Sequence, residues 1–152
     1  MRLGAVQTLP SQAYAGSTRG WGNMGQASSW SHEIVLPGEP VSVLRARRFV
    51  CLHLVDHRLW YLVDDVRLVA SELAANAVRH AHTPFTVILE QASQSVLLTV
   101  HDGSPFRPVH LATELMDTAG RGISIVELVS QTWGVAEGPA KGKSVWASFA
   151  TR

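Results

Sequence analysis

The sequence predicts an α+β domain of two layers, with helices on one face of a mixed, largely antiparallel sheet. Three observations predict this fold class. Apolar residues recur at helical spacing from Pro40 to Asp56 and again over residues 66–83. The spacing then changes to two over residues 85–102, where two β-rich runs are joined by three residues. With 152 residues and 46% apolar content, the chain has room for one domain of ordinary size.

Composition excludes several functional classes. The net charge of +1 gives no reason to expect direct binding of nucleic acid. No apolar run approaches the roughly 18 residues of a membrane span, and the N-terminal apolar segment is too short and broken for a typical signal peptide. Cys51 is the only cysteine, so no internal disulfide can form. We therefore expect a cytoplasmic protein, in a reducing compartment, with no membrane partner.

The chain divides into a tail and a folded domain. Residues 1–30 are rich in Gly, Ser, Gln and Ala without a period, which predicts a flexible N-terminal tail or an arm that orders with a partner. The domain, residues 31–152, begins with a strand over residues 31–37 that Pro37 and Gly38 stop.

The helix expected from Pro40 to about Asp56 carries two notable groups of side chains. Its dense basic patch is interpreted as a solvated face, with a docking site as the alternative; it consists of Arg45, Arg47 and Arg48. His53 and His57 have the i, i+4 spacing of zinc ligands on a helix, but no third ligand stands nearby in the sequence. We therefore expect no metal there.

The helix over residues 66–83 carries the most informative pattern. One apolar stripe consists of Leu62, Val66, Val69, Leu73 and Ala77. Glu72, Asn76 and Arg79 line a second stripe beside it, at the border of the core. The helix should end near Thr83, because the residue before Pro84 avoids the helical region.

The polar stripe suits magnesium-nucleotide chemistry. Magnesium takes hard oxygen ligands and accepts only one or two from protein, so one Asn oxygen beside ATP phosphates is a suitable ligand. A carboxylate one turn earlier could take a proton from an attacking group, and an Arg one turn later could hold phosphate. A solvated helix face carries the same residue types, so the stripe alone leaves both interpretations open.

The strands predicted over residues 85–91 and 95–102 end in a second polar feature. Val96, Leu98 and Val100 share one face of the second strand, and Asp102 has the same parity. A carboxylate at the end of a core-facing row is costly unless a donor such as an adenine amino group binds it. Alternatively, residues 102–105 are only a turn, since Asp and Gly are favoured there.

The last third of the chain is predicted from shorter signals. We expect a short helix near residues 111–117, a helix over residues 120–131 and a hairpin of residues 133–138 with 143–151. Gly120 and Gly122 would let the backbone approach a ligand, and a helix start attracts phosphate. Residues 138–144 resemble a P-loop. However, Glu137 occupies the position of the first Gly of that motif, and the residues that follow alternate like a strand, so we reject that interpretation.

Three short motifs follow one another along the chain: Glu-x-x-x-Asn at 72–76, Asp-Gly-Ser-Pro at 102–105 and Gly-Arg-Gly at 120–122. In this order they resemble the N, G1 and G2 boxes of the GHKL ATPase superfamily, which shares the Bergerat ATP-binding fold. The segments ELAANAVRHA, VHDGSPFRP, GRGISIVELV and GKSVWASF are most similar to the free-standing anti-sigma-factor serine/threonine kinases. The resemblance covers residues 31–152.

The resemblance implies a role for each motif residue. Glu72 matches the general base, Asn76 the magnesium ligand and Arg79 a basic position near phosphate. Asp102, followed by Gly103, matches the acceptor for the adenine amino group. The segment that wraps the phosphates is matched by Gly120, Arg121, Gly122 and Ile123. The implied cofactors are ATP and Mg²⁺, and the implied partners are a sigma factor, a small antagonist protein that is phosphorylated, and a second copy of the chain.

This sequence departs from the family pattern at two places. Ser104 and Phe106 occupy the two later Gly positions of the G1 box, and Lys143 follows Gly142 where the superfamily often has Thr. Either Lys143 or Ser144 could reach the nucleotide. Two alternatives to a serine/threonine kinase remain: a non-catalytic ATP-binding docking module, and a detached histidine-kinase catalytic domain whose acceptor His would come from another protein.

Overall fold

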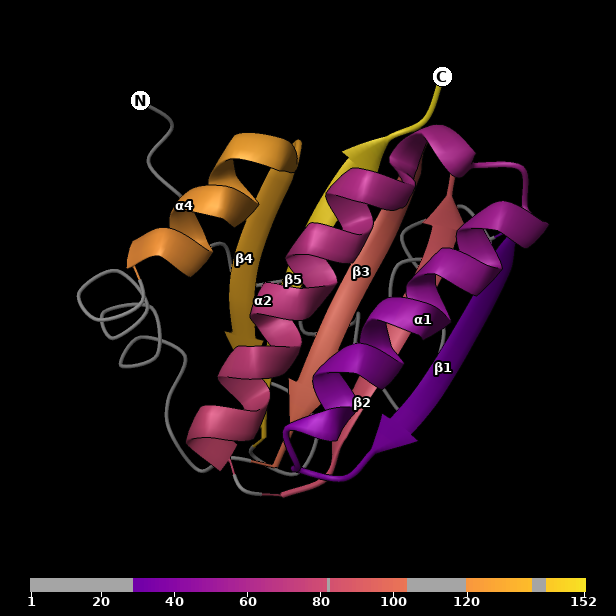
Figure 1. Ribbon diagram of the computed structural model, residues 1–152. Helices are drawn as coiled ribbons and strands as arrows, with labels where there is room; N and C mark the ends of the chain where they lie inside the picture. Colours follow the sequence, from indigo (N-terminus) through magenta and orange to yellow (C-terminus); the bar gives the residue numbers. More distant parts are fainter. Residues whose placement is uncertain (1–28, 82, 104–119, 138–141) are drawn as a thin grey trace.

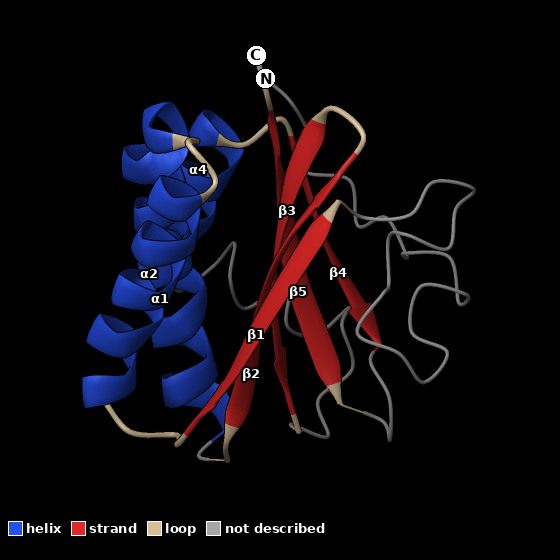
Figure 2. Cartoon of the chain, turned by 90° about the vertical axis from the view of Figure 1, so that its right-hand side faces the viewer, coloured by secondary structure: helices blue, strands red, loops and turns tan. Residues whose placement is uncertain are grey.

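The computed structural model describes residues 29–81, 83–103, 120–137 and 142–152. Its helices form one layer and its five-stranded sheet the other, as Figure 2 shows. The strands are β1 (Trp30–Leu36), β2 (Phe85–Ala92), β3 (Ser95–Asp102), β4 (Thr132–Glu137) and β5 (Lys143–Ala150). The helices are α1 (Val41–Asp56), the short η2 (Trp60–Leu62), α2 (Val63–Ala81) and α4 (Gly120–Val129). This confirms the predicted α+β class, with helices on one face.

The sheet has the order β1-β2-β3-β5-β4, and each of these pairings is antiparallel. Both predicted hairpins are present: β2 with β3, through a turn in which Ser93 has a φ of 56°, and β4 with β5. β5 inserts between β3 and β4, so the last strand of the chain becomes a neighbour of β3. That crossover places the start of β5 beside the end of β3.

The core fills the space between the helices and the facing side of the sheet (Figure 1). The apolar stripe predicted on α2 and just before it is buried throughout; it comprises Leu62, Val66, Val69, Leu73 and Ala77. From the sheet, alternate residues of β3 and β5 point toward this stripe, among them Leu98, Val100 and Val145. In α4, Val126 is buried, whereas Leu128 is 83% exposed and faces away from the core.

A cluster of aromatic rings joins the edge strand β1 to α1. Trp30 stacks on His57 with ring centroids 4.0 Å apart, and His32 stacks on His53 at 3.8 Å. His32 and His57 approach Nε2 to Nε2 at 2.8 Å, so one ring donates a hydrogen bond to the other. The contact of His32 with His53 and His57 was not predicted from the sequence, because it depends on β1 lying beside α1. Among the described residues, no group of three side chains is arranged to hold a metal ion.

Several predictions lie outside the described residues: the conformation of most of the tail, the short helix near residues 111–117, and the contacts of Ser104 and Phe106. In the part that is described, no helix combines the length and apolar character needed to cross a bilayer. The strand at residues 143–150 supports the rejection of the P-loop, because that motif requires a helix to follow its Lys-Ser.

Candidate nucleotide site

Asn76 lies on the buried flank of α2, between the core residues Leu73 and Ala77, and is only 5% exposed. Its Oδ1 accepts a hydrogen bond from Nη2 of Arg79, which orients the amide, because a guanidinium can only donate. Asn76 Nδ2 is buried and has no hydrogen-bond partner among the described residues. A buried amide nitrogen without an acceptor is costly, so this position suits a polar ligand.

The other two residues of the predicted polar stripe lie at different depths. Glu72, one helical turn before Asn76, is half-buried, and Arg79 is exposed. Arg79 also belongs to the last turn of α2, where a positive charge interacts favourably with the helix dipole. The stripe therefore runs from a half-buried carboxylate, through a buried amide, to a solvent-accessible guanidinium.

Asp102 is the last residue of β3 and is 3% exposed. It continues the core-facing row that includes Leu98 and Val100, as its parity predicted. Directly opposite it in the antiparallel register stands Lys143, the first residue of β5, which is 2% exposed. Lys143 Nζ lies 3.7 Å from Asp102 Oδ2. The carboxylate thus lies inside the protein and is paired with a buried ammonium group.

The register between β3 and β5 depends on Gly142. A Cβ at this position would lie 2.3 Å from the backbone oxygen of Asp102 and 2.8 Å from His101 Cε1, closer than atoms can pack. Ser144 points to the other face of the sheet, where its Oγ lies 3.0 Å from His101 Nδ1. Of the two candidates after Gly142, Lys143 therefore faces the helices, and Ser144 does not.

The elements that carry these residues converge at one end of the molecule. α2 packs directly on β3, and Figure 1 shows that both end at the same end of the domain, where β5 begins. Gly103 follows β3 at the surface there. The backbone of residues 120–123 forms the first turn of α4, a helix that packs against α2 and whose start points toward that end. The side chains of Arg121 and Ile123 lie outside the described residues.

These residues fit a magnesium nucleotide on three grounds. Asp102 is a buried acceptor for an amino group on a base. The first turn of α4 presents backbone N–H groups suited to phosphate. Asn76 could supply one hard oxygen to a magnesium ion if Arg79 turned away from Oδ1, and the exposed position of Arg79 permits that movement. Bound magnesium would neutralise charge on the phosphates.

Lys143 is the site residue whose role the sequence did not determine. A signal was present, because Lys143 has the same parity as Val145, Ala147 and Phe149, which share the core-facing side of β5. What the sequence lacked was the strand order, which places β5 next to β3 and so brings Lys143 to Asp102.

Comparison with known proteins identifies the family of the chain. The model of the histidine kinase-like ATPase domain matches residues 37–149, which include both α2 and the end of β3. No curated protein matches the chain in sequence. The match covers most of the chain and includes Asn76 and Asp102. The chain therefore belongs to the histidine kinase-like ATPases of the GHKL superfamily and contains an ATP-binding module of that type.

Proposed function

We propose that the protein is an ATP-dependent serine/threonine kinase of the anti-sigma-factor type, which phosphorylates a small antagonist protein and binds a sigma factor. The observation that carries the proposal is the half-buried carboxylate of Glu72, one turn before the buried Asn76. Pure nucleotide binding needs no base in that position, whereas transfer to a hydroxyl does.

In the proposed reaction the residues of this chain mainly position the reactants. Asp102 holds the base, and the first turn of α4 holds the phosphate chain through its N–H groups. The hydroxyl oxygen of the acceptor attacks the γ-phosphorus, and Glu72 accepts the proton of that hydroxyl. The bond between the γ-phosphorus and the oxygen of the β-phosphate breaks, and ADP leaves. Arg79 exchanges its hydrogen bond with Asn76 for one with phosphate.

The experiment follows phosphate from labelled ATP, with magnesium and candidate antagonists encoded beside the gene. We expect label on a serine or threonine of one antagonist. Glu72→Gln should lower the transfer rate at least about 100-fold, the usual contribution of a general base, while ATP binding is kept. Glu33→Gln, at an exposed carboxylate on β1, is the matched control and should transfer normally.

Two results would refute the kinase assignment. If Glu72→Gln transfers phosphate as fast as the wild type, Glu72 is not the base. If the wild type binds ATP but labels no antagonist and the Glu72→Gln protein still regulates its partner, the chain is a docking module. Label appearing on histidine instead would support the detached histidine-kinase alternative.

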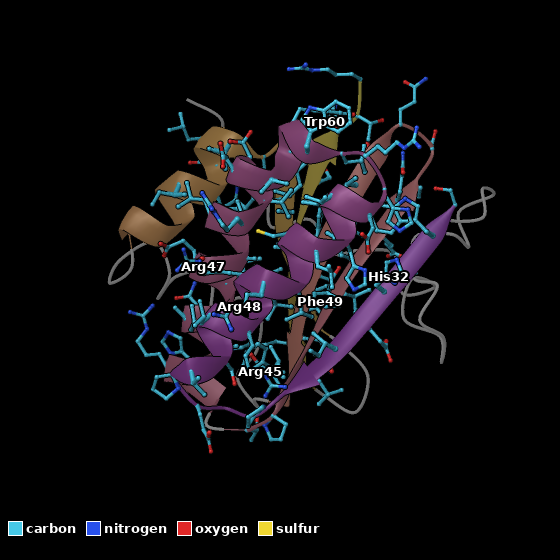
Figure 3. The ribbon with its side chains drawn as sticks, turned by 45° about the vertical axis from the view of Figure 1, so that its right-hand side comes forward. His32, Arg45, Arg47, Arg48, Phe49 and Trp60 are labelled. Carbon is cyan, nitrogen blue, oxygen red and sulfur yellow. The ribbon has the colours of Figure 1, made fainter. Side chains whose placement is uncertain are left out.

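The outer face of α1 supports the partner-binding part of the proposal. Four apolar side chains on this helix are at least 42% exposed: Val41, Leu44, Leu52 and Val55. The exposed Arg45, Arg47 and Arg48 lie among them, and Figure 3 labels these three along α1. An exposed apolar stripe with three arginines beside it is typical of a protein-binding surface and suits an acidic partner.

This part of the proposal has its own test. Leu52→Asp should weaken binding of the sigma factor or antagonist at least about tenfold and leave ATP binding unchanged, because a buried apolar contact is lost and a like charge meets the acidic partner. Leu128→Asp, on the exposed side of α4, is the control. If both variants bind the partner equally well, the outer face of α1 is not the docking surface. Light scattering tests the expected homodimer.

A further inference from the structure

The sheet has a helix-free face, the side that points away from α1, α2 and α4, and this face is buried along the central strands. Leu97 belongs to it, because side chains alternate and the neighbouring Leu98 points into the core. Leu97 is nevertheless only 4% exposed, and Trp146, on the same face of β5, is 2% exposed. Neither residue belongs to the core cluster between helices and sheet. Val35, on this face at the β1 edge, is 61% exposed, so the burial is confined to the middle of the sheet.

The ring of Trp146 shows why a further layer is needed. A Cβ on Gly134 of β4 would lie 2.7–2.9 Å from three atoms of the indole, so the ring lies over Gly134. One side of the ring rests on the sheet, and the other faces outward, where no described helix lies (Figure 2). A large ring that is 2% exposed in this position must be covered from outside the sheet. Apolar faces of this kind are covered by another segment of the chain or by a partner.

The N-terminal segment, residues 1–28, joins the fold where this cover is needed. Ser29 N donates a hydrogen bond to the backbone oxygen of Gln91, and Gln91 is opposite Val96 in the register, so the chain enters at the end of the sheet that carries Leu97. From β1 to β5 there are three strand spacings, which together measure about 14 Å. The chain from Trp21 to Ser29 can span up to about 26 Å when extended. The segment is therefore long enough to reach the central strands.

Charge also favours this segment. Residues 1–28 contain Arg2 and Arg19 and no acidic residue, whereas Glu33 and Glu90 place two carboxylates on the helix-free face. Residues 104–119, the other long segment outside the described residues, contain one arginine and two acidic residues. They also follow the opposite end of β3 from the end that carries Leu97. Electrostatic complementarity and position thus both select the N-terminal segment.

We propose that residues 1–28 dock on the helix-free face of the sheet, with Trp21 packed on Leu97 and Trp146 and the two arginines directed toward the carboxylates of that face. Trp21 is the largest apolar side chain of the segment, and aromatic pairs bury much area for each residue. The N-terminal segment is thus an intramolecular partner of the sheet. The proposal does not depend on kinase activity, because this face is turned away from α2 and α4.

Fluorine NMR on the full chain tests the proposal, with 5-fluorotryptophan at all tryptophan positions. Replacing each tryptophan in turn by Phe assigns the signals. A ring that touches water changes its ¹⁹F shift between H₂O and D₂O, whereas a buried ring does not. We expect little or no change for Trp21 and Trp146 and a full change for Trp60, which is 67% exposed.

A pair of variants tests whether Trp21 covers Trp146 itself. Trp21→Ser in the full chain should make the Trp146 signal sensitive to D₂O, because its cover is lost. Trp60→Ser removes an equally large but exposed ring, so it is the matched control and should leave Trp146 protected.

Three results would overturn the proposal. In the first, Trp21 of the wild type responds to D₂O as strongly as Trp60, and this result decides even if Trp21→Ser does not fold. In the second, Trp146 stays protected in folded Trp21→Ser, so the segment docks elsewhere. In the third, Trp146 is protected beside an exposed Trp21 and loses protection on dilution, which would assign the cover to a second copy of the chain.

Discussion

Gly142→Ala tests how the strand ends build the site. The new Cβ would lie 2.3 Å from the backbone oxygen of Asp102 and 2.8 Å from the ring of His101. Because the first of these contacts is with backbone, no side-chain rotation relieves it, and the start of β5 must move away from β3. Overpacking of this kind costs about 1–3 kcal/mol, and the reduced entropy of the unfolded chain offsets about 0.4–1 kcal/mol.

The expected net loss is about 1.3 kcal/mol, which lowers the melting temperature by about 3–5 °C at roughly 2–4 °C per kcal/mol. Calorimetric melting of the purified proteins measures it. Gly103→Ala, directly after the neighbouring strand β3, is the control, because its Cβ would meet Thr83 Oγ1 at an ordinary 3.7 Å. A Gly142→Ala protein that melts like Gly103→Ala would refute the close approach of β5 to Asp102.

Two further predictions concern stability. Burial lowers the pKa of His53, His57 and His101, with His32 adding to the effect at the first two. Just below pH 6.5, these histidines therefore bind more protons in the unfolded chain than in the folded protein, so the free energy of unfolding should rise with pH below 6.5 and then level off. Denaturant midpoints from pH 5 to 8 measure this change. A flat profile would contradict it. In α4, Val126→Ala should cost about 2 kcal/mol and Leu128→Ser less than about 0.5 kcal/mol, because only Val126 is buried. Equal losses in urea melts would refute the orientation of α4.

Local sequence patterns predicted the helices and strands, and they predicted the direction of some side chains at the candidate site. The apolar stripe around Val66 and Leu73 identified the buried face of α2, and the parity of Asp102 with Val100 placed its carboxylate toward the core. Both depend on a repeat that lies within one element. Helical and strand periods of this kind are readable because side-chain direction follows directly from backbone geometry.

The remaining features depend on contacts between distant segments. The hydrogen bond from Arg79 to Asn76 depends on rotamers, and the pairing of Lys143 with Asp102 depends on the order of the strands. The ring cluster needs β1 beside α1, which brings His32 to His57 across 25 positions of sequence. Residue spacing within one element carries no information about contacts between elements, so these contacts could not be predicted from the sequence.

In the proposed site, Asp102 holds the base of ATP inside the domain. Calorimetric titration with ATP and magnesium, comparing the wild type with Asp102→Asn, tests it most directly, with Asp65→Asn at an exposed position of α2 as the control. Binding by the wild type and by Asp65→Asn, with at least about a tenfold loss for folded Asp102→Asn, is the expected result. Equal affinity of all three proteins, or no binding by the wild type at millimolar ATP, would contradict it.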